Sequence, residues 1–268
     1  MLRAAPSLAL WLRKAGVPLE GCRVMEVGTG RWLDLPLGLY LCGAGPIDTF
    51  DLHRYLKRRR VERTAAFFRA NPGRLAGLFA PVVPGETLSR RLRAIAEAGG
   101  AAEIMLRAGI RYHAPSNAAA TGLPAGSIDA HISYTVFEHI PAEALRAILV
   151  EARRILAPGG VVLHHIDPSD HCAHDDPTIT PVNFLRFSDE EWQRYAGNQF
   201  GYHNRLRAFQ YREIFESCGY EILRWEEHVD RRSLELLESG FPLDTQFRAM
   251  PATALCCSVF RVLARPRP

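Results

Sequence analysis

The amino-acid sequence predicts an α/β fold, namely a doubly wound, Rossmann-like sheet of seven mostly parallel strands with helical insertions. The first observation behind this prediction is a strand, a glycine turn, a helix-like segment and a second strand within about 30 residues, the pattern of a βαβ unit. The second is that strand and helix patterns alternate again from residue 110 onward. The third is a helix pattern over 142–157, which Pro158-Gly159-Gly160 ends before another strand.

Length and composition indicate a single globular domain over residues 1–268. Hydrophobic residues make up 47% of the chain and charged residues 23%, a balance that excludes a disordered chain, a collagen-like chain and a small disulfide-stabilised protein. No window approaches the roughly 18 uninterrupted apolar residues of a membrane span. The apolar run Leu8–Leu12 is followed by Arg13 and Lys14, whereas a secretory signal has its charges first. We therefore expect a surface helix there and a cytoplasmic protein.

The predicted elements of the first half surround a helical insertion. The first strand, Cys22–Val27, leads into the glycine turn, an apolar helix-like segment continues to Cys42, and a second strand covers Ile47–Asp51. Residues 55–110 are rich in Arg, Ala and Leu, with Pro and Gly breaks. We expect two or three short helices in this insertion, which could close over the site as a lid. Its basic run, His53–Arg63, is interpreted as a solvated helix face rather than a nucleic-acid surface.

The second half returns to strands and helices around a polar loop. Leu145, Ile148 and Leu149 begin one apolar stripe along the predicted helix Ala142–Ala157. The segment at about 167–187 is polar and broken, so we expect a substrate loop there. Ser188-Asp-Glu-Glu has the form of a capping box and predicts the start of a helix. The remaining predicted elements are strands at 110–113, 128–134, 161–166, 220–225 and 254–263 and a helix at 208–217.

The glycine turn lies at the carboxyl end of the first strand, where ligands bind in open α/β sheets. Gly28 and Gly30 let the backbone approach a ligand closely and adopt positive φ angles. Asp51 ends the second strand, and a carboxylate there can accept hydrogen bonds from both hydroxyls of a ribose. Leu33 stands where a dinucleotide fingerprint needs its third glycine, so a nucleoside without phosphates fits better than NAD or FAD. A plain strand-turn-helix corner is the alternative interpretation.

Four segments, taken in order, resemble the class I S-adenosylmethionine-dependent methyltransferases, specifically the bacterial small-molecule group. Residues 24–30 (VMEVGTG) are similar to the family's first motif, and Asp51 matches its ribose-binding acid. Residues 117–140 are similar to the region with the pattern acid-Ala, Leu-Pro, Asp and Leu-Glu-His, and residues 154–160 (RILAPGG) to the Leu-x-Pro-Gly-Gly turn. The first motif departs from the family at Arg31-Trp32, where a third glycine is common.

This resemblance implies S-adenosyl-L-methionine as the cofactor. Asn117 stands where an adenine-contacting Asp is usual, and its amide can still serve the adenine edge. Tyr134 is placed to face the methionine part of the cofactor, with packing under a helix as the alternative. The cofactor-binding residues that we predict are Glu26, Gly28, Thr29, Gly30, Asp51, Asn117, Tyr134 and His139.

A polar cluster follows the strand after Gly160, and four of the ten histidines fall within residues 164–174. His165 and Asp167 share one strand face, and an imidazole beside a carboxylate is the arrangement that a general base requires. Base and substrate contacts, a divalent metal site and a solvated loop are the three interpretations. We favour the first, with His165, Asp167 and His171 as catalytic residues, and assign no metal ligand because no metal signature is present.

A second polar group, residues 202–207, precedes the predicted helix at 208–217. Arg205 or Arg207 could hold a carboxylate or phosphate of the acceptor through its planar guanidinium group, and a surface arginine is the alternative. The substrate-binding residues that we predict are Tyr202, Asn204 and Arg205.

Together these features predict an enzyme that transfers a methyl group to oxygen or nitrogen of a small polar metabolite. One alternative is cyclisation of S-adenosylmethionine to azetidine-2-carboxylate with release of methylthioadenosine. Another is a non-catalytic cofactor-binding protein, which the altered first motif suggests. We expect a small-molecule substrate and neither a nucleic-acid nor a membrane partner, and the sequence leaves the oligomeric state open.

Overall fold

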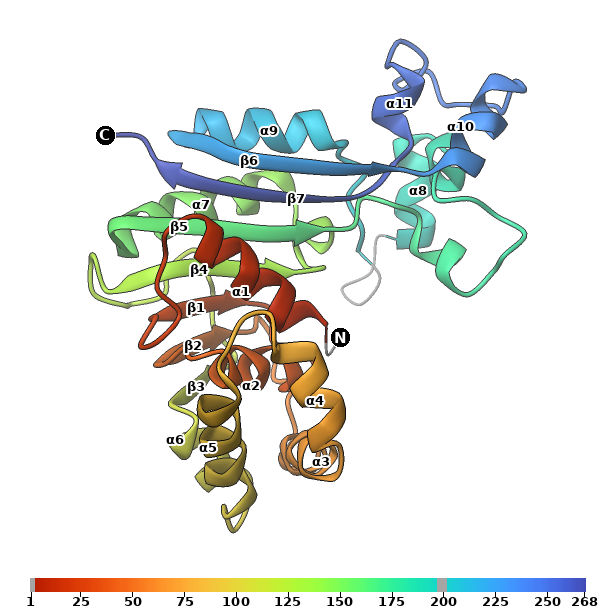
Figure 1. Ribbon diagram of the computed structural model, residues 1–268. Coiled ribbons are helices and arrows are strands. Elements are labelled where there is room, and N and C mark those ends of the chain that lie inside the picture. The colour runs from red at the N-terminus through yellow and green to blue at the C-terminus, as the bar shows by residue number, and fades with distance from the viewer. Residues whose placement is uncertain (1–2, 197–201) are drawn as a thin grey trace. The chain divides into compact units, whose positions relative to one another are not determined.

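A computed structural model describes residues 3–196 and 202–268 (Figure 1). The fold is α/β with one seven-stranded sheet in the order β3-β2-β1-β4-β5-β7-β6, which confirms the predicted fold class. The chain divides into two compact units, Met1–Tyr134 with Val150–Leu163, and Thr135–Leu149 with His164–Pro268. Each unit is described by itself below.

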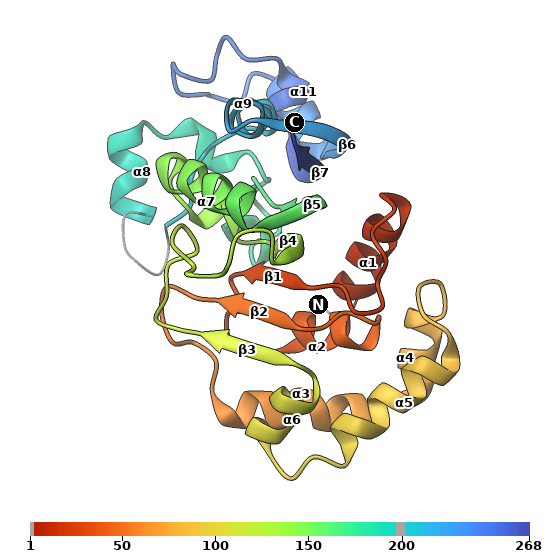
Figure 2. The same cartoon turned by 90° about the vertical axis from the view of Figure 1, so that its left-hand side faces the viewer.

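Four parallel strands form the centre of the first unit. They are β1 (Val24–Val27), β2 (Ile47–Phe50), β3 (Ile110–His113) and β4 (Ile128–Tyr134). β1 pairs with both β2 and β4, and β2 pairs with β3. Figure 2 shows β1, β2 and β3 side by side and running in the same direction. Every residue of β1 and β2 is buried, as expected for parallel strands that are covered on both faces.

Helix α1 (Ala4–Lys14) packs against α2 (Asp34–Leu41) in the first unit. The sequence predicted a surface helix around residues 8–12, and this prediction was wrong in one respect, because an apolar face of α1 is buried. Leu8 and Ala9 are fully buried, and Leu12 is 1% exposed. Arg13 and Lys14 are exposed at the last turn, where cations interact favourably with the helix dipole.

The insertion between β2 and β3 holds four helices rather than the predicted two or three. They are α3 (Arg58–Ala70), α4 (Pro72–Phe79), α5 (Gly85–Ala96) and α6 (Ala101–Arg107). Each helix buries apolar residues such as Phe68, Phe79 and Ile95. The basic residues of α3 lie largely on its exposed face, and the Arg60 guanidinium stacks 4.1 Å from the centroid of the Trp32 ring. A lid function for these helices stays a prediction.

The second unit is built on an antiparallel pair, β6 (Tyr220–Val229) and β7 (Cys257–Pro266), with α9 (Ala208–Ser217) packed on both strands (Figure 1). Two elements contribute residues to both units, α7 (Ala142–Ile155) and β5 (Leu156–Ile166). The shorter elements of the second unit are the 3-10 helices η1 (Phe137–His139), η2 (His171–His174) and η3 (Asn183–Arg186) and the helices α8 (Asp189–Ala196), α10 (Arg231–Glu238) and α11 (Ala252–Leu255).

The boundaries of several elements test the sequence predictions directly. The capping box before α8 is confirmed, because the Ser188 backbone N–H donates to Glu191 at 2.8 Å and the Glu191 N–H donates to the Ser188 hydroxyl at 3.2 Å. The last strand begins at Cys257 rather than at residue 254, because the residues after Pro251 form α11. Helix α10 was not predicted; the Asp230 carboxylate caps it by accepting from the Ser233 N–H at 2.7 Å.

Within the described residues, no helix is both long and apolar enough to cross a membrane.

The contact between α1 and α2 depends on a residue without a side chain. A Cβ atom placed on Gly38 would lie 2.5 Å from the Cβ of Ala5, whereas a Cβ placed on Gly77 in α4 would have no heavy atom within 4 Å. We expect Gly38→Ala to be less stable than Gly77→Ala by about 1–3 kcal/mol, because overpacking offsets the gain in helix propensity. Chemical denaturation of the two variants measures this difference. The double variant Ala5→Gly/Gly38→Ala should recover most of the lost stability; equal stability of the two single variants would contradict this account.

Candidate functional site

The turn after β1 is held by backbone geometry that glycine adopts readily. Gly28 and Gly30 have φ angles of +84° and +67°. The Gly28 N–H donates to the Phe50 carbonyl at 2.8 Å, which joins the turn to the end of β2. A Cβ atom placed on Gly30 would meet no heavy atom within 4 Å. The backbone of the turn therefore faces open space, where a ligand can approach it closely.

The Asp51 carboxylate closes this turn from the neighbouring strand. The Gly30 N–H lies 3.2 and 3.1 Å from its two oxygens, and the Tyr112 hydroxyl donates to Oδ2 at 2.9 Å. Burial raises the pKa of Asp51 to about 6, although the hydrogen bonds from Tyr112 and Gly30 oppose this shift. Two carboxylate oxygens can accept up to about four hydrogen bonds, so Asp51 keeps acceptor capacity for a ligand hydroxyl.

Glu26 lies at the centre of a buried hydrogen-bond chain in the first unit. The Thr49 hydroxyl donates to the Glu26 carboxylate, and the Thr29 hydroxyl is hydrogen-bonded to that of Thr49. Burial raises the pKa of Glu26 to about 8, and the hydrogen bond from Thr49 opposes the shift. Thr49 and Tyr112 were not predicted as site residues. The period-two alternation of a strand, which places residues 49 and 51 on one face, could have indicated Thr49.

The other predicted cofactor contacts of the first unit lie further along the chain. Asn117 is exposed, and its Oδ1 accepts from the Ala119 N–H at 2.9 Å, which forms a local turn. Tyr134 is half-buried and is the last residue of β4. The following residue, Thr135, has a φ angle of +52°, which is unusual for a β-branched residue.

A cluster of imidazole rings lies in the second unit. The ring centroid of His171 is 5.0 Å from that of His139, 4.9 Å from that of His174 and 4.4 Å from that of His203. The structure thus brings together residues from η1, η2 and the segment before α9. Asp167 lies beside them, with its carboxylate oxygens 3.9 Å from His171 Nε2 and 3.3 Å from His174 Nε2.

Two of the predicted catalytic residues, Asp167 and His171, therefore lie close together, whereas the third, His165, has a different neighbour. His165 is half-buried, and its Nδ1 lies 3.4 Å from Nη2 of Arg261. Burial lowers the pKa of His165 to about 4, and the Arg261 charge lowers it further. The carboxylate of Asp167 contacts the two imidazoles of η2, while Arg261 flanks His165. His139, which the resemblance assigned to the cofactor, belongs by its contacts to the histidine cluster.

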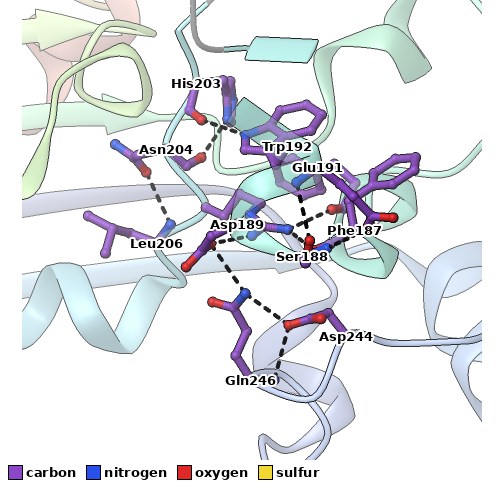
Figure 3. Close-up of polar contacts among 12 residues, drawn as sticks. Phe187, Ser188, Asp189, Glu191, Trp192, His203, Asn204, Leu206, Asp244 and Gln246 are labelled. Atoms are coloured by element: carbon purple, nitrogen blue, oxygen red, sulfur yellow. Dashed lines mark hydrogen bonds and ion pairs between the residues drawn. The ribbon is translucent and has the colours of Figure 1, made fainter. Parts of the chain in front are cut away.

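The three predicted substrate-binding residues, Tyr202, Asn204 and Arg205, all line one pocket of about 600 Å³ in the second unit. Figure 3 shows part of its wall, where Gln246 and Asp189 are joined by a hydrogen bond of 3.2 Å. The remaining lining residues, both apolar and polar, are Ala142, Asp189, Trp192, Gln193, Ala196, Leu206, Gln210, Gln246, Phe247 and Met250. A pocket of this size and mixed lining suits a small molecule.

Contacts within the protein occupy much of the polar surface of Asn204 and Arg205. Asn204 Nδ2 donates to the carbonyls of Phe137 and Ile140 at 2.9 Å each, and Oδ1 accepts from the Tyr211 hydroxyl at 3.0 Å. The Arg205 guanidinium donates to two backbone carbonyls of the segment 184–187 and pairs with Asp189. These contacts give both residues a role in shaping the pocket wall.

Comparison with known proteins agrees with this architecture. Residues 84–164 match a family model described as a methyltransferase domain. Among solved structures, magnesium protoporphyrin IX methyltransferase from Synechocystis PCC 6803 is similar over 99% of this chain and 83% of its own, at 14% identity and a TM-score of 0.51. A putative sarcosine dimethylglycine methyltransferase from Galdieria sulphuraria is similar over 98% and 85%, at 17% identity and a TM-score of 0.53. The chain has the fold of the class I S-adenosylmethionine-dependent methyltransferases.

The fold that the motif resemblance implies is thereby confirmed. Geranyl diphosphate C-methyltransferase from Streptomyces coelicolor A3(2) is similar over 97% of this chain and 77% of its own, at 13% identity and a TM-score of 0.53. No curated protein sequence matches the chain. The family-model match begins after the glycine turn, so the geometry of Gly28, Gly30 and Asp51 is an independent observation.

The buried Glu26 carboxyl makes stability depend on pH. Its pKa rises from an ordinary value of 4.5 to about 8 on folding, so its contribution to stability is fully present below pH 4.5 and is lost as pH rises through about 8. We expect wild type to lose stability relative to Glu26→Gln across this window, on the order of a few kcal/mol. Melting temperatures of the two ligand-free proteins from pH 4.5 to 8.5 measure this effect. A difference that stays constant with pH would contradict the raised pKa.

Proposed function

We propose that this protein transfers a methyl group from S-adenosyl-L-methionine to oxygen or nitrogen of a small molecule. The observation that carries the proposal is the turn at Gly28 and Gly30, closed by the Asp51 carboxylate, within the fold of the class I methyltransferases. This turn combines an open backbone with an acceptor for hydroxyl groups. That combination fits the sugar of a nucleoside.

The proposed cofactor site uses the ends of β1 and β2. Asp51 accepts hydrogen bonds from the ribose hydroxyls while Tyr112 and Gly30 hold its carboxylate in place. Glu26 and Thr29 support the turn through Thr49. We assign Asn117 to the adenine edge and Tyr134 to the methionine part, as the family resemblance implies. When bound, the cofactor supplies an activated methyl group on a sulfonium.

The proposed acceptor site lies in the second unit. The pocket beside Tyr202 and Arg205 combines aromatic surface with amide and carboxylate groups, so it suits an acceptor with both apolar and polar parts. In the adjacent cluster, Asp167 lies within ion-pair distance of His171. Burial lowers the pKa of His171, which keeps this imidazole neutral and able to accept a proton near neutral pH.

In methyl transfer, the main role of these residues is to position the reactants. Displacement at carbon requires the acceptor atom to lie in line with the leaving sulfur. Holding the acceptor and the cofactor in this arrangement can lower the barrier by roughly 7–11 kcal/mol. An acceptor hydroxyl or ammonium must also lose a proton. His171, with Asp167 stabilising its protonated form, is the base that we propose for this step.

Replacing the proposed ribose ligand should weaken cofactor binding. We expect Asp51→Ala to lose roughly 1–3 kcal/mol of affinity for S-adenosylmethionine, or about 5- to 150-fold in Kd, through the lost hydrogen bonds. Asp129→Asn is the matched control, because Asp129 lies at the opposite, amino-terminal end of β4 and pairs with Arg23. Calorimetric titration of both variants measures the effect. Unchanged affinity in Asp51→Ala would refute the placement of the sugar.

The product identifies the reaction. Purified protein is incubated with S-adenosylmethionine alone and then with a bacterial metabolite extract, and the sulfur-containing product is identified by mass. We expect S-adenosylhomocysteine only in the second incubation, together with an acceptor heavier by one methyl group. Methylthioadenosine in the first incubation would show that the protein cyclises the cofactor instead of transferring its methyl group. Binding without any product would indicate a non-catalytic protein.

A further inference from the structure

The Glu138 carboxylate of the second unit is fully buried without the partners that such a group needs. Neither of its oxygens accepts a well-formed hydrogen bond or pairs with a cationic side chain within the described residues, and the side chain has no measurable exposure. Burying an ionised carboxylate costs several kcal/mol unless a positive charge or hydrogen-bond donors compensate it. Burial raises the pKa of Glu138 well above its ordinary value, although the backbone N–H groups of Glu138 and Asp167 oppose this shift. The Glu138 carboxylate has no role in the methyl-transfer mechanism proposed above.

The neighbouring imidazoles direct lone pairs, not protons, into the same cluster. His139 Nδ1 lies 2.9 Å from the Tyr202 carbonyl, and His203 Nδ1 lies 2.6 Å from the Asn204 carbonyl. A carbonyl oxygen only accepts, so in both residues Nδ1 carries the proton and Nε2 carries the lone pair. The Nε2 atoms of His171 and His203 are buried without a hydrogen-bond partner in the part of the chain that the structure describes.

We propose that Glu138, His139 and His171 bind a divalent transition-metal ion. One ligand atom from each residue lies within 4.8 Å of the other two. Two ligands at zinc distances of about 2.1 Å are at most about 4.2 Å apart, so small side-chain adjustments complete the site. The ion would supply the positive charge that the buried carboxylate lacks.

A second trio, Asp167, His171 and His174, meets the same distance criterion and shares His171 with the first. Its carboxylate already has hydrogen-bond donors, because Asp167 Oδ1 accepts from the Ser169 N–H at 3.0 Å and from the Ser169 hydroxyl. His174 is exposed, whereas Glu138 is fully buried. The need for a cation is therefore greatest at Glu138. Asp167 then acts as a neighbour that orients His171 and adds negative charge.

The ligand types select the class of metal. Two imidazoles and one carboxylate suit Zn²⁺, Fe²⁺ and similar ions, whereas Mg²⁺ and Ca²⁺ prefer oxygen ligands. Three protein ligands leave an open coordination position, as in catalytic rather than structural zinc sites. With the ion bound, His171 would be a ligand and no longer a free base; an oxygen or nitrogen of the acceptor would take the open position, where the ion would favour loss of its proton. This last step rests on the proposed function, whereas binding of the ion does not.

Zinc titration tests the site directly. Protein freed of metal with a chelator and dialysed is titrated with ZnCl₂ by calorimetry, without S-adenosylmethionine. We expect one ion per chain in wild type and a loss of affinity of about 100-fold or more in Glu138→Gln and in His171→Asn, since even residues that only support metal ligands cost 10- to 100-fold. His228→Asn, at an exposed position of β6, is the matched control and should bind as wild type does.

His174→Asn separates the two trios. Retained zinc affinity in this variant, with loss in Glu138→Gln, is the expected result. The reverse pattern would place the ion at Asp167 and His174 and overturn the assignment. Absence of zinc binding in folded wild type would overturn the proposal altogether.

Thermal stability gives a second measurement that does not depend on catalysis. In a chelating buffer, Glu138→Gln should melt at or above the wild-type temperature, because it removes a buried carboxylate that lacks a partner. Added Zn²⁺ should raise the melting temperature of wild type and leave that of Glu138→Gln unchanged. Equal zinc responses in both proteins would refute Glu138 as a ligand. S-adenosylmethionine titration of the same samples tests the proposed function separately, so either proposal can fail while the other stands.

Discussion

Hydrogen bonds to the buried carboxylates of Glu26 and Asp51 hold the ends of β1 and β2 together. Both strands are covered on both faces, so a carboxylate at their ends loses water and must find donors within the protein. Thr49 donates to Glu26, and Gly30 and Tyr112 donate to Asp51. The conformation of the glycine turn depends on this arrangement, because the Gly30 N–H of the turn is one of the donors to Asp51. A ligand that binds here meets a turn that is already formed.

Glu138 presents the same physical problem in the second unit with a different solution. The hydroxyl and phenol donors beside Glu26 and Asp51 have no counterpart at Glu138 among the described residues; besides the backbone N–H groups of Glu138 and Asp167, its neighbours include the imidazoles of His139 and His171. Hydrogen-bond donors stabilise a buried carboxylate without any ligand. A carboxylate that lies beside nitrogen lone pairs can instead bind a cation together with them. The difference between the two environments is the physical basis for assigning a nucleoside to one unit and a metal ion to the other.

Local patterns allowed much of the fold to be predicted. The strands Ile110–His113 and Ile128–Tyr134 and the helix Ala208–Ser217 have the predicted limits, because hydrophobic periodicity and glycine breaks are properties of neighbouring residues. Helix α10 was missed because its sequence carries few buried apolar residues, and its start depends on the single cap Asp230. Tyr112 and Glu138 were missed as site residues for a different reason. Their partners lie 61 and 33 positions away in the sequence, at Asp51 and His171, so only the folded chain reveals them.

The sequence cluster at 164–176 shows that a local pattern does not specify all the neighbours of its residues. The pattern predicted His165, Asp167 and His171 as catalytic residues, and the fold places Asp167 beside the imidazoles of η2 and adds Glu138 and His139 from another segment. Solved structures that share this fold at 13–17% identity are named for different acceptors, a porphyrin, a glycine derivative and geranyl diphosphate. Fold similarity therefore carries no information about the acceptor of this chain. Under the function that we propose, the acceptor has to match the imidazole and carboxylate groups gathered around His171 and the pocket that Tyr202 and Arg205 line.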